Sequence, residues 1–355
     1  MKRGYFKSVG TSAALGSITS LRNIGEYDSK TWYASNSGTT LAVYSVASLT
    51  GAATAEHTRA TAAGATIHNA ALRINNNYIM AAWMVSYNVL GTTYYFVYMC
   101  VYVIGIETWV DITAYSVGTT EGRIIDVFQD TNIYVLFTDG TTLKIASAVV
   151  GLTVDDTLAT LKDDQAVWGG YYNDITDKYE FLVYKDDDKF YKVTFDPVNE
   201  FVETEYDYFD PPSAYDVDEQ QWFSKVRYST NLNYIFLSKY NFYYYDRVAA
   251  EWMEVAVGGG TNSVGVVWDV YDDGVFSTYY MITYIGYNNS LYKIFENGGI
   301  AKVLAPASAE WTIGYDDWIA AGTTIYQYTI EAFVSQVPSV VRTQYGQAQI
   351  GRAHV

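Results

Sequence analysis

The stretch from Lys178 to Tyr206, KYEFLVYKDDDKFYKVTFDPVNEFVETEY, decides the fold because it predicts three short strands joined by two turns. Tyr179, Phe181 and Val183 alternate with residues of the opposite face, and the same period of two returns over residues 190–195. That period, carried by aromatic and β-branched residues, is typical of β-strands. Lys185 to Asp188 supplies a polar first turn, and Asp196-Pro197-Val198-Asn199 a second. We therefore predict a three-strand meander.

The same plan recurs along the chain at intervals of roughly 40 to 55 residues, which is the repeat length of β-propeller blades. Each repeat opens on an aromatic residue at the start of a hydrophobic strand. These residues are Trp32, Tyr78, Tyr134, Tyr179, Tyr234, Tyr280 and Trp318. The sequence thus predicts an all-β fold, a β-propeller of about six to seven blades, in a single domain over residues 1–349.

The end of the chain bears on how much of the ring is expected. Residues 350–355, IGRAHV, resemble the translation of a sequencing adapter, so we set them aside as a tail of that origin. On this interpretation the natural chain continues past about Gln349, and the seventh repeat is cut soon after Phe333. We therefore expect an incomplete propeller in which the first and last strands cannot pair to close the ring.

Composition limits the partners. The 355 residues carry a formal charge of −17, which repels nucleic-acid phosphate and anionic lipid. We predict no direct nucleic-acid binding and no membrane association. The apolar run from Tyr94 to Ile106 is too short for a spanning helix, and we interpret it as a buried strand pair of the second blade. Cys100 is the only cysteine, so an internal disulfide is excluded.

No motif in the sequence indicates catalysis or a cofactor. A His-Glu-x-x-His helix, a Gly-x-Ser-x-Gly elbow and a P-loop are all absent from the sequence. Residues 186–188 offer three carboxylates that suit calcium, but the spacing fits no calcium loop, so we interpret them as a solvated turn. A glycosidase would need two carboxylates across a pocket, and Asp174, Asp210 and Glu310 cannot be ranked for that role. We predict a protein that is not an enzyme and has no metal or cofactor.

Surface aromatics are the remaining functional signal. Tyr240, Tyr243 and Tyr245 belong to an aromatic hairpin, and successive strand residues point to opposite faces, so some of these rings face outward. Tyrosine suits both protein interfaces and carbohydrate stacking. We take these three residues as candidate binding aromatics. The alternative is that they pack between blades.

The N-terminal segment carries a family resemblance. The segments KRGYFKSVG at 2–10, GSITSL at 16–21 and GTTLAVY at 38–44 resemble the opening of tailed-bacteriophage virion propellers. The last segment departs from that pattern because Ala42 and Val43 separate Leu41 from Tyr44. The resemblance covers about the first 45 residues, and it implies a structural protein of the tail, nozzle or head-to-tail connector.

Together these observations predict a non-enzymatic structural or interaction module located in a phage virion. Its partners would be other virion structural proteins or further copies of itself. The alternative is a carbohydrate-binding propeller, lectin-like or receptor-binding, acting outside the cell or at its surface. A propeller glycoside hydrolase is the third hypothesis.

Overall fold

The structure is a computed structural model, and the account below concerns the residues that it describes. These are residues 2–11, 24–48, 50–130, 132–148, 151–161, 167–173, 178–187, 190–196, 200–205, 234–237, 241–246, 251–256, 265–272, 277–285, 288–295, 300–304, 311–315, 318–321 and 324–332.

The described strands form seven antiparallel sheets, which we number as blades in chain order. Blade 1 comprises β2 (Ile24–Tyr27), β3 (Lys30–Ser37), β4 (Thr40–Val46) and β5 (Ala53–Ala60). Blade 2 comprises β6 (Thr66–Ile74), β7 (Tyr78–Val89), β8 (Thr92–Val103) and β9 (Thr108–Gly118), with a one-turn 3-10 helix, η3 (Ile104–Ile106), between the last two. Blade 3 comprises β10 (Ile124–Gln129), β11 (Ile133–Asp139), β12 (Thr142–Ala148) and β13 (Leu152–Thr160). Blade 4 comprises β14 (Val167–Asn173), β15 (Lys178–Tyr184), β16 (Phe190–Asp196) and β17 (Glu200–Glu205).

The second half of the chain continues the series. Blade 5 has three described strands, β18 (Tyr234–Leu237), β19 (Asn241–Asp246) and β20 (Glu251–Ala256). Blade 6 comprises β21 (Gly265–Asp272), β22 (Ser277–Ile285), β23 (Asn288–Phe295) and β24 (Ile300–Leu304). Blade 7 combines β25 (Trp311–Tyr315), β26 (Trp318–Ala321) and β27 (Thr324–Ala332) with β1 (Lys2–Thr11) from the start of the chain.

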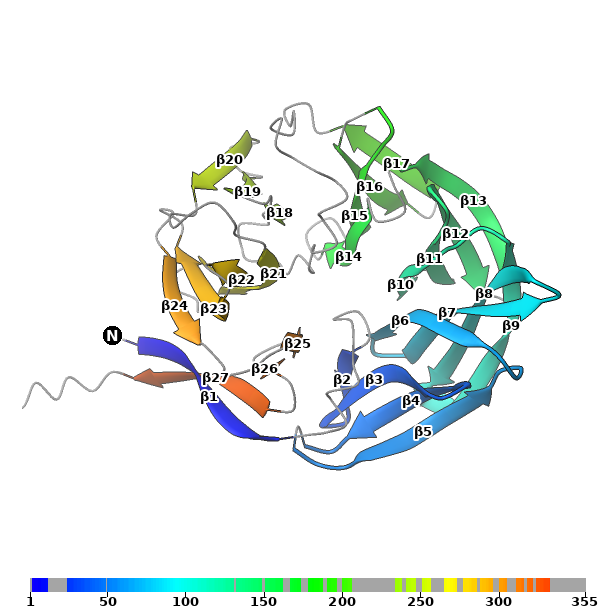
Figure 1. Ribbon diagram of the computed structural model, residues 1–355, viewed down its shortest axis with the longest axis horizontal. Helices are drawn as coiled ribbons and strands as arrows, with labels where there is room; N and C mark the ends of the chain where they lie inside the picture. Colours follow the sequence, from blue (N-terminus) through cyan, green and yellow to red (C-terminus); the bar gives the residue numbers. More distant parts are fainter. Residues whose placement is uncertain are drawn as a thin grey trace, which may run out of the picture.

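The blades stand around a common centre, with β6, β10, β14 and β21 among the strands nearest to it (Figure 1). This arrangement of four-stranded antiparallel sheets is a β-propeller. The prediction of an all-β propeller of about six to seven blades is therefore confirmed.

The ring is joined by its first and last strands. β1 pairs antiparallel with β27 from Lys2 opposite Ala332 to Thr11 opposite Thr324, with a bulge between Ser8 and Gly10. The expectation that these strands cannot pair is wrong. The physical reason is that β27 ends at Ala332, so every residue that the pairing needs precedes the position at which the repeat was expected to be cut.

The strands follow the alternation that the sequence predicts. The Lys178 to Tyr206 stretch forms β15, β16 and β17 in antiparallel register, which confirms the meander. Six of the aromatics chosen to open a repeat lie in the second strand of their sheet, and Tyr234 begins β18. The run from Tyr94 to Ile106 belongs to the single strand β8 and to η3, rather than to a strand pair. No helix within the described ranges is long and apolar enough to cross a membrane.

The hydrophobic core lies between neighbouring blades. Between blades 1 and 2, the buried residues Trp32 and Val43 of blade 1 pack with Ala81, Trp83 and Cys100 of blade 2. The indole nitrogen of Trp83 donates a hydrogen bond to the Ser35 carbonyl oxygen at 3.0 Å, so its polar atom is satisfied across the same boundary. Each large apolar side chain buried in this way contributes roughly 1.5–3 kcal/mol.

Candidate functional site

The structure places the sequence-predicted residues unevenly. Tyr243 and Tyr245 lie in β19, where Tyr243 is opposite Phe236 and Glu254, and Tyr245 is opposite Tyr234 and Trp252. Tyr240, the carboxylates Asp174, Asp210 and Glu310, and the 350–355 tail fall outside the described residues.

The acidic turn of blade 4 is described in part. Asp186 and Asp187 are both exposed, and the Tyr191 hydroxyl donates a hydrogen bond to Asp187 Oδ2 at 2.6 Å. These positions agree with a solvated turn. Among the residues that the structure describes, no group of three or more His, Cys, Asp or Glu side chains is placed to hold a metal ion.

Two polar clusters connect neighbouring blades, and the outer one lies where β5 faces β8 and β9. A bulge in β5 creates it: Val43 is opposite His57 and Tyr44 is opposite Ala55, which leaves Glu56 as an extra residue. Successive residues of a regular strand point to opposite faces, and a bulge re-aims one of them. As a result, Glu56 and His57 both lie on the side of blade 1 that faces blade 2.

His57 reaches across the blade boundary to two side chains of β9. Its ring stacks on the Trp109 indole, with centroids 4.7 Å apart and planes 11° apart. Its Nε2 donates a hydrogen bond to Asp111 Oδ1 at 2.9 Å. The Tyr102 ring of β8 lies next to the Trp109 indole, with the two ring centroids 5.2 Å apart. His57 is 18% exposed and Asp111 43% exposed, so the contact is open to solvent.

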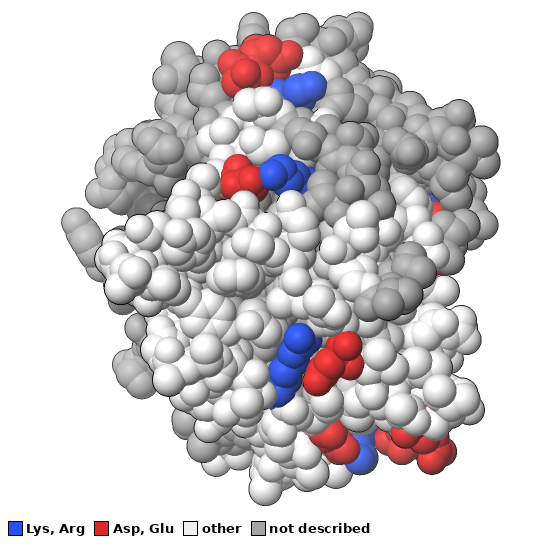
Figure 2. All heavy atoms as spheres, turned by 90° about the vertical axis from the view of Figure 1, so that its right-hand side faces the viewer, with Lys and Arg blue, Asp and Glu red and all other residues white. Residues whose placement is uncertain are grey.

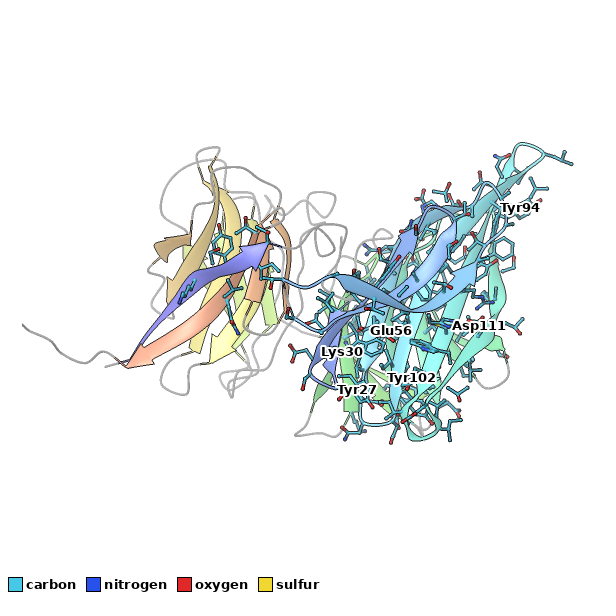
Figure 3. All side chains as sticks on the ribbon, turned by 90° about the horizontal axis from the view of Figure 1, so that it is seen from below. Tyr27, Lys30, Glu56, Tyr94, Tyr102 and Asp111 are labelled. Atoms are coloured by element: carbon cyan, nitrogen blue, oxygen red, sulfur yellow. The ribbon has the colours of Figure 1, made fainter. Side chains whose placement is uncertain are left out.

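Glu56 completes the outer cluster, which we define as Lys30, Glu56, His57, Tyr102, Trp109 and Asp111. Glu56 Oε1 accepts hydrogen bonds from the Ser45 hydroxyl and from Lys30 Nζ, the latter at 3.3 Å. In Figure 3, Lys30, Glu56, Tyr102 and Asp111 gather over blades 1 and 2, away from the hairpin that carries Tyr94. The cluster therefore combines partly exposed rings with carboxylate acceptors and cationic donors at one place.

Ionisable groups around the outer cluster affect one another. Burial raises the pKa of Tyr102, and the charge of Glu107 and the neighbouring Tyr27 and Glu56 raise it further, whereas Lys30 lowers it. Burial also raises the pKa of Tyr98 to about 12, together with its hydrogen bond to Tyr87. Both phenols therefore stay protonated at neutral pH and can donate hydrogen bonds.

Arg59 connects the strands that carry the outer cluster. Its Nη1 donates hydrogen bonds to the carbonyl oxygens of Met99, at 2.9 Å, and Ile112, at 2.8 Å, and its guanidinium lies 4.8 Å from the centre of the Tyr98 ring. These contacts join β5 to both β8 and β9. Arg59 is thus a positioning residue that holds the strands carrying His57, Trp109 and Asp111 together.

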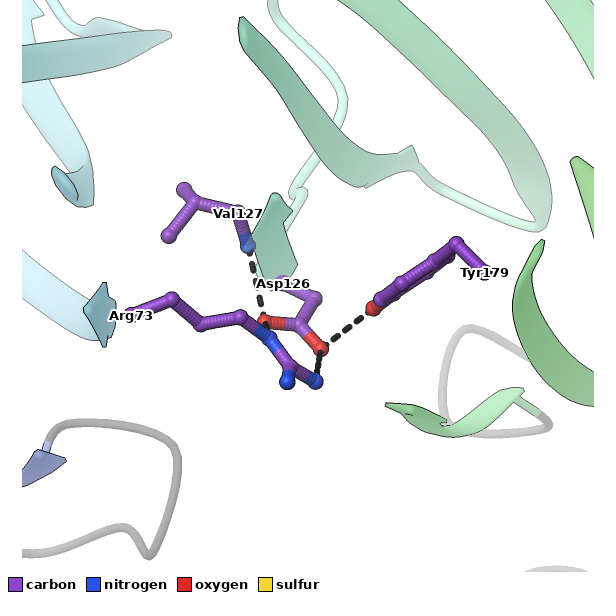
Figure 4. Close-up of polar contacts among 4 residues, drawn as sticks. All are labelled: Arg73, Asp126, Val127 and Tyr179. Carbon is purple, nitrogen blue, oxygen red and sulfur yellow. Dashed lines mark hydrogen bonds and ion pairs between the residues drawn. The ribbon is translucent and has the colours of Figure 1, made fainter. Parts of the chain in front are cut away.

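The inner cluster links three blades near the centre of the ring. Arg73 of β6 donates from Nε to Asp126 Oδ1 at 2.8 Å and from Nη2 to Oδ2 at 2.5 Å, and Asp126 belongs to β10. The Val127 backbone nitrogen donates to Oδ1 at 2.8 Å, and the Tyr179 hydroxyl of β15 donates to Oδ2 at 2.5 Å (Figure 4). The Tyr179 ring also stacks on Phe128, with centroids 3.9 Å apart.

The inner cluster is built for structure. Asp126 is 1% exposed, and its carboxylate accepts four hydrogen bonds, which is the pattern that makes a buried charge tolerable. Burial alone would lower the pKa of Arg73, but the charge of Asp126 and then the Tyr179 phenol raise it above its usual value. Arg73 therefore remains a cation paired with Asp126.

Sequence reasoning missed both clusters, although a signal for them exists. Arg73 and Asp126, and again Asp126 and Tyr179, are 53 residues apart, and His57 and Asp111 are 54 apart. These separations are close to the length of one blade repeat, which varies along the chain. Polar residues spaced by one repeat are therefore candidates for contacts between adjacent blades.

On the face of the molecule that Figure 2 draws, the described charges are few and lie in pairs of opposite sign. Figure 2 shows a face on which most of the described surface is uncharged, and the Lys and Arg groups lie next to Asp or Glu groups. Within the outer cluster Lys30 lies beside Glu56 and His57 beside Asp111, so the cluster offers ring contacts and directed hydrogen bonds rather than a strong field of one sign.

Comparison with known proteins supports the fold. No protein-family model and no curated protein matches the chain. Among solved structures, the extracellular domain of BT4673 from B. thetaiotaomicron is similar, with a TM-score of 0.52 and 8% identity; the similarity covers 92% of this chain and 42% of that one. This chain thus spans less than half of that protein's length.

Two further solved structures are similar over most of this chain. The β-propeller domain of the Trilobed protease from Pyrococcus furiosus has a TM-score of 0.47 and 11% identity, over 89% of this chain and 96% of that one. Aleuria aurantia lectin, in complex with α-methyl-L-fucoside, has a TM-score of 0.43 and 8% identity, over 82% and 99%. At such identities the similarity concerns the fold alone.

Proposed function

We propose that this chain is a non-enzymatic β-propeller that binds carbohydrate through the outer cluster. The observation that carries the proposal is the half-buried Trp109 indole, flanked by Tyr102 and placed beside the exposed Asp111 carboxylate. Aromatic rings contact the C–H faces of sugar rings, while carboxylates accept hydrogen bonds from sugar hydroxyl groups. A small number of polar groups around an aromatic surface is how many ligand sites fix orientation.

The two carboxylates of the outer cluster suit binding. Glu56 accepts from Ser45 and Lys30, and Asp111 accepts from His57, so each is held in place by a donor of the protein. An ionised carboxylate has room for about four hydrogen bonds, which leaves acceptor capacity for ligand hydroxyls. Lys30 supplies donors for ligand oxygens at the same place.

His57 has a second role in this proposal. Its ring covers one face of the Trp109 indole, so the indole is held in a single orientation before a ligand arrives. Holding a binding side chain in its bound conformation reduces the entropy lost on association. A ligand then contacts the part of the indole that His57 leaves open, together with Tyr102.

A glycan array followed by isothermal titration calorimetry tests the proposal. We expect Trp109→Ala and Asp111→Ala each to weaken binding of the best glycan by more than about tenfold. Tyr94→Ala and Glu121→Ala remove an exposed ring and an exposed carboxylate away from the cluster, and as matched controls they should change affinity less than about twofold.

Three outcomes would overturn the proposal. One is an array without a binding glycan, and another is affinity that survives both cluster substitutions. The third is loss of affinity in Tyr243→Ala and Tyr245→Ala instead, which would move the site to β19. Turnover of a bound polysaccharide would separately contradict the non-enzymatic assignment.

The virion hypothesis stays a prediction that rests on the N-terminal motifs alone. Mass spectrometry of intact phage particles that finds this chain would support it, and finding the chain only in a cellular proteome would contradict it. A carbohydrate-binding propeller at a particle surface or outside a cell would use the same outer cluster, so the binding experiment does not depend on that outcome.

A further inference from the structure

The β7–β8 hairpin of blade 2 projects beyond the strands on either side of it. β6 pairs with β7 as far as Ser86, and β9 pairs with β8 as far as Tyr95. The last three pairs of the hairpin, over residues 87–94, therefore lack a flanking strand within the described part of the chain. Figures 1 and 3 show this segment standing out from the ring, with Tyr94 on it. We call residues 87–94 the hairpin tip.

The turn at the tip holds an unusual residue. Leu90 and Gly91 form the two-residue loop, and both have positive φ, 52° and 87°. Such a turn favours Asn, Asp or Gly at its first position, because other side chains clash with the backbone in the left-handed conformation. The chain follows that preference at the β2–β3 turn, where Asp28 and Ser29 have φ of 52° and 58°.

The tip also exposes apolar surface. Leu90 is 101% exposed, Val89 is 53% exposed and Tyr94 is 37% exposed. In a chain without a partner, Leu90 is therefore unfavourable for two reasons: its backbone has a left-handed conformation, and its apolar side chain is exposed to water. Backbone strain of this kind clusters at functional sites, which makes the tip a candidate for one.

Charge indicates what can cover the tip. The chain carries a charge of −17, yet residues 74–106 contain no Asp, Glu, Lys or Arg. The net charge opposes the approach of two copies of this chain, and the tip is a place where they can meet without bringing like charges together. Because the tip projects, a contact between two tips also keeps the two charged bodies apart.

We propose that the hairpin tip is a self-association surface, on which the tip of a second copy packs in a two-fold symmetric contact. Val89, Leu90 and Tyr94 of each copy would then be covered by the same residues of the other, as an isologous interface requires. The contact is smaller than a standard interface, so the dissociation constant is expected to be on the order of 0.1 mM. This proposal is independent of carbohydrate binding.

A lipid surface is a weaker candidate for the same tip. Val89 and Leu90 are the only aliphatic side chains at the turn, and the net charge opposes approach to anionic headgroups. Added salt screens the repulsion between the two bodies, so it should strengthen the dimer.

Sedimentation velocity of the full chain, over a range of concentrations at low and high sodium chloride, tests the proposal. We expect a concentration-dependent dimer that becomes tighter with salt. Leu90→Asn should weaken it by more than about tenfold. The same variant should melt at the same or a higher temperature, since Asn tolerates the left-handed conformation at this turn. Reduced association without reduced stability is a result that a folding defect cannot produce.

Ile106→Ser provides the matched control. Ile106 is 67% exposed and lies after the opposite end of β8, so the change removes a similar apolar surface away from the tip and should leave the dimer unchanged. A chain that stays monomeric at all concentrations and both salt levels would overturn the proposal. So would equal weakening by Ile106→Ser, or binding to phosphatidylcholine vesicles that Leu90→Asn abolishes.

Discussion

The inner and outer clusters use similar chemistry in different surroundings. Each joins a cationic or imidazole side chain of one blade to an aspartate of the next, Arg73 to Asp126 and His57 to Asp111. Asp126 is buried with four donors, whereas the Asp111 side chain is 43% exposed and lies beside an indole. Burial therefore separates a contact that holds blades together from one that remains available to a ligand.

The largest effect is expected at the inner cluster. Asp126→Ala would remove the carboxylate that accepts hydrogen bonds from the half-buried Arg73 and from Tyr179, so the free energy of unfolding should fall by roughly 1–3 kcal/mol. Urea unfolding followed by intrinsic fluorescence measures this loss. Asp126→Asn keeps the volume and part of the hydrogen bonding, and its loss should be smaller. A cost below about 1 kcal/mol for the alanine variant would show that the inner cluster is not structural.

Alkaline pH extends the comparison to a buried neutral group. Burial, reinforced by the neighbouring Tyr44, raises the pKa of Tyr33 to about 12, against about 10 in the unfolded chain. As pH rises, Tyr33 therefore loses its proton in the unfolded chain before it does so in the folded one. The contribution of the protonated Tyr33 to folding stability is fully present below about pH 10 and is lost as pH rises toward 12. Between about pH 8 and pH 11, the free energy of unfolding of Tyr33→Phe should therefore fall by about 1 kcal/mol less than that of the wild type.

Unfolding curves of the wild type and of Tyr33→Phe at the two pH values provide this measurement. Tyr94→Phe is a control, because Tyr94 is exposed and lies in β8, outside the Tyr33–Tyr44 pair. If the free energy of unfolding falls equally between the two pH values in Tyr33→Phe and in the wild type, Tyr33 does not have the raised pKa.

The smallest effect on stability is expected at the outer cluster. Asp111→Asn should change the free energy of unfolding by about 0.2–1 kcal/mol, because the contact with His57 is solvated and screened. A double-mutant cycle with His57→Gln gives the coupling between the two side chains. A loss as large as that of Asp126→Ala would erase the distinction between the two clusters and would make the outer one structural as well.

The fold could be predicted from the sequence because each β-strand has a local signature, the alternation of residues between its two faces. The alternation at Tyr179, Phe181 and Val183 predicted β15, and the recurring aromatic placed a strand in each blade. The first strands of the blades were less evident, since they carry no shared aromatic. The pairing of β1 with β27 was missed because it joins residues about 320 positions apart, and period alone does not report such pairs.

The candidate site depended on details that no local pattern carries. His57 and Trp109 could be read as ordinary strand residues, and their stacking follows from the packing of β5 against β9. The bulge at Glu56 turns two adjacent side chains toward the same neighbouring blade. The tyrosines at 243 and 245 were instead chosen for their crowding, which is a compositional signal, and they remain predictions.

The sequence by itself determined the strand period, the repeat and hence the propeller, because each of these depends on residues close together in the chain. Only the tertiary structure decided that β1 completes blade 7, that Asp126 is enclosed and that Asp111 is open. The reason is physical: burial and partnership arise when residues about one blade apart are brought into contact by the register of two sheets. Those contacts determine whether a carboxylate stabilises the fold or is available to a ligand.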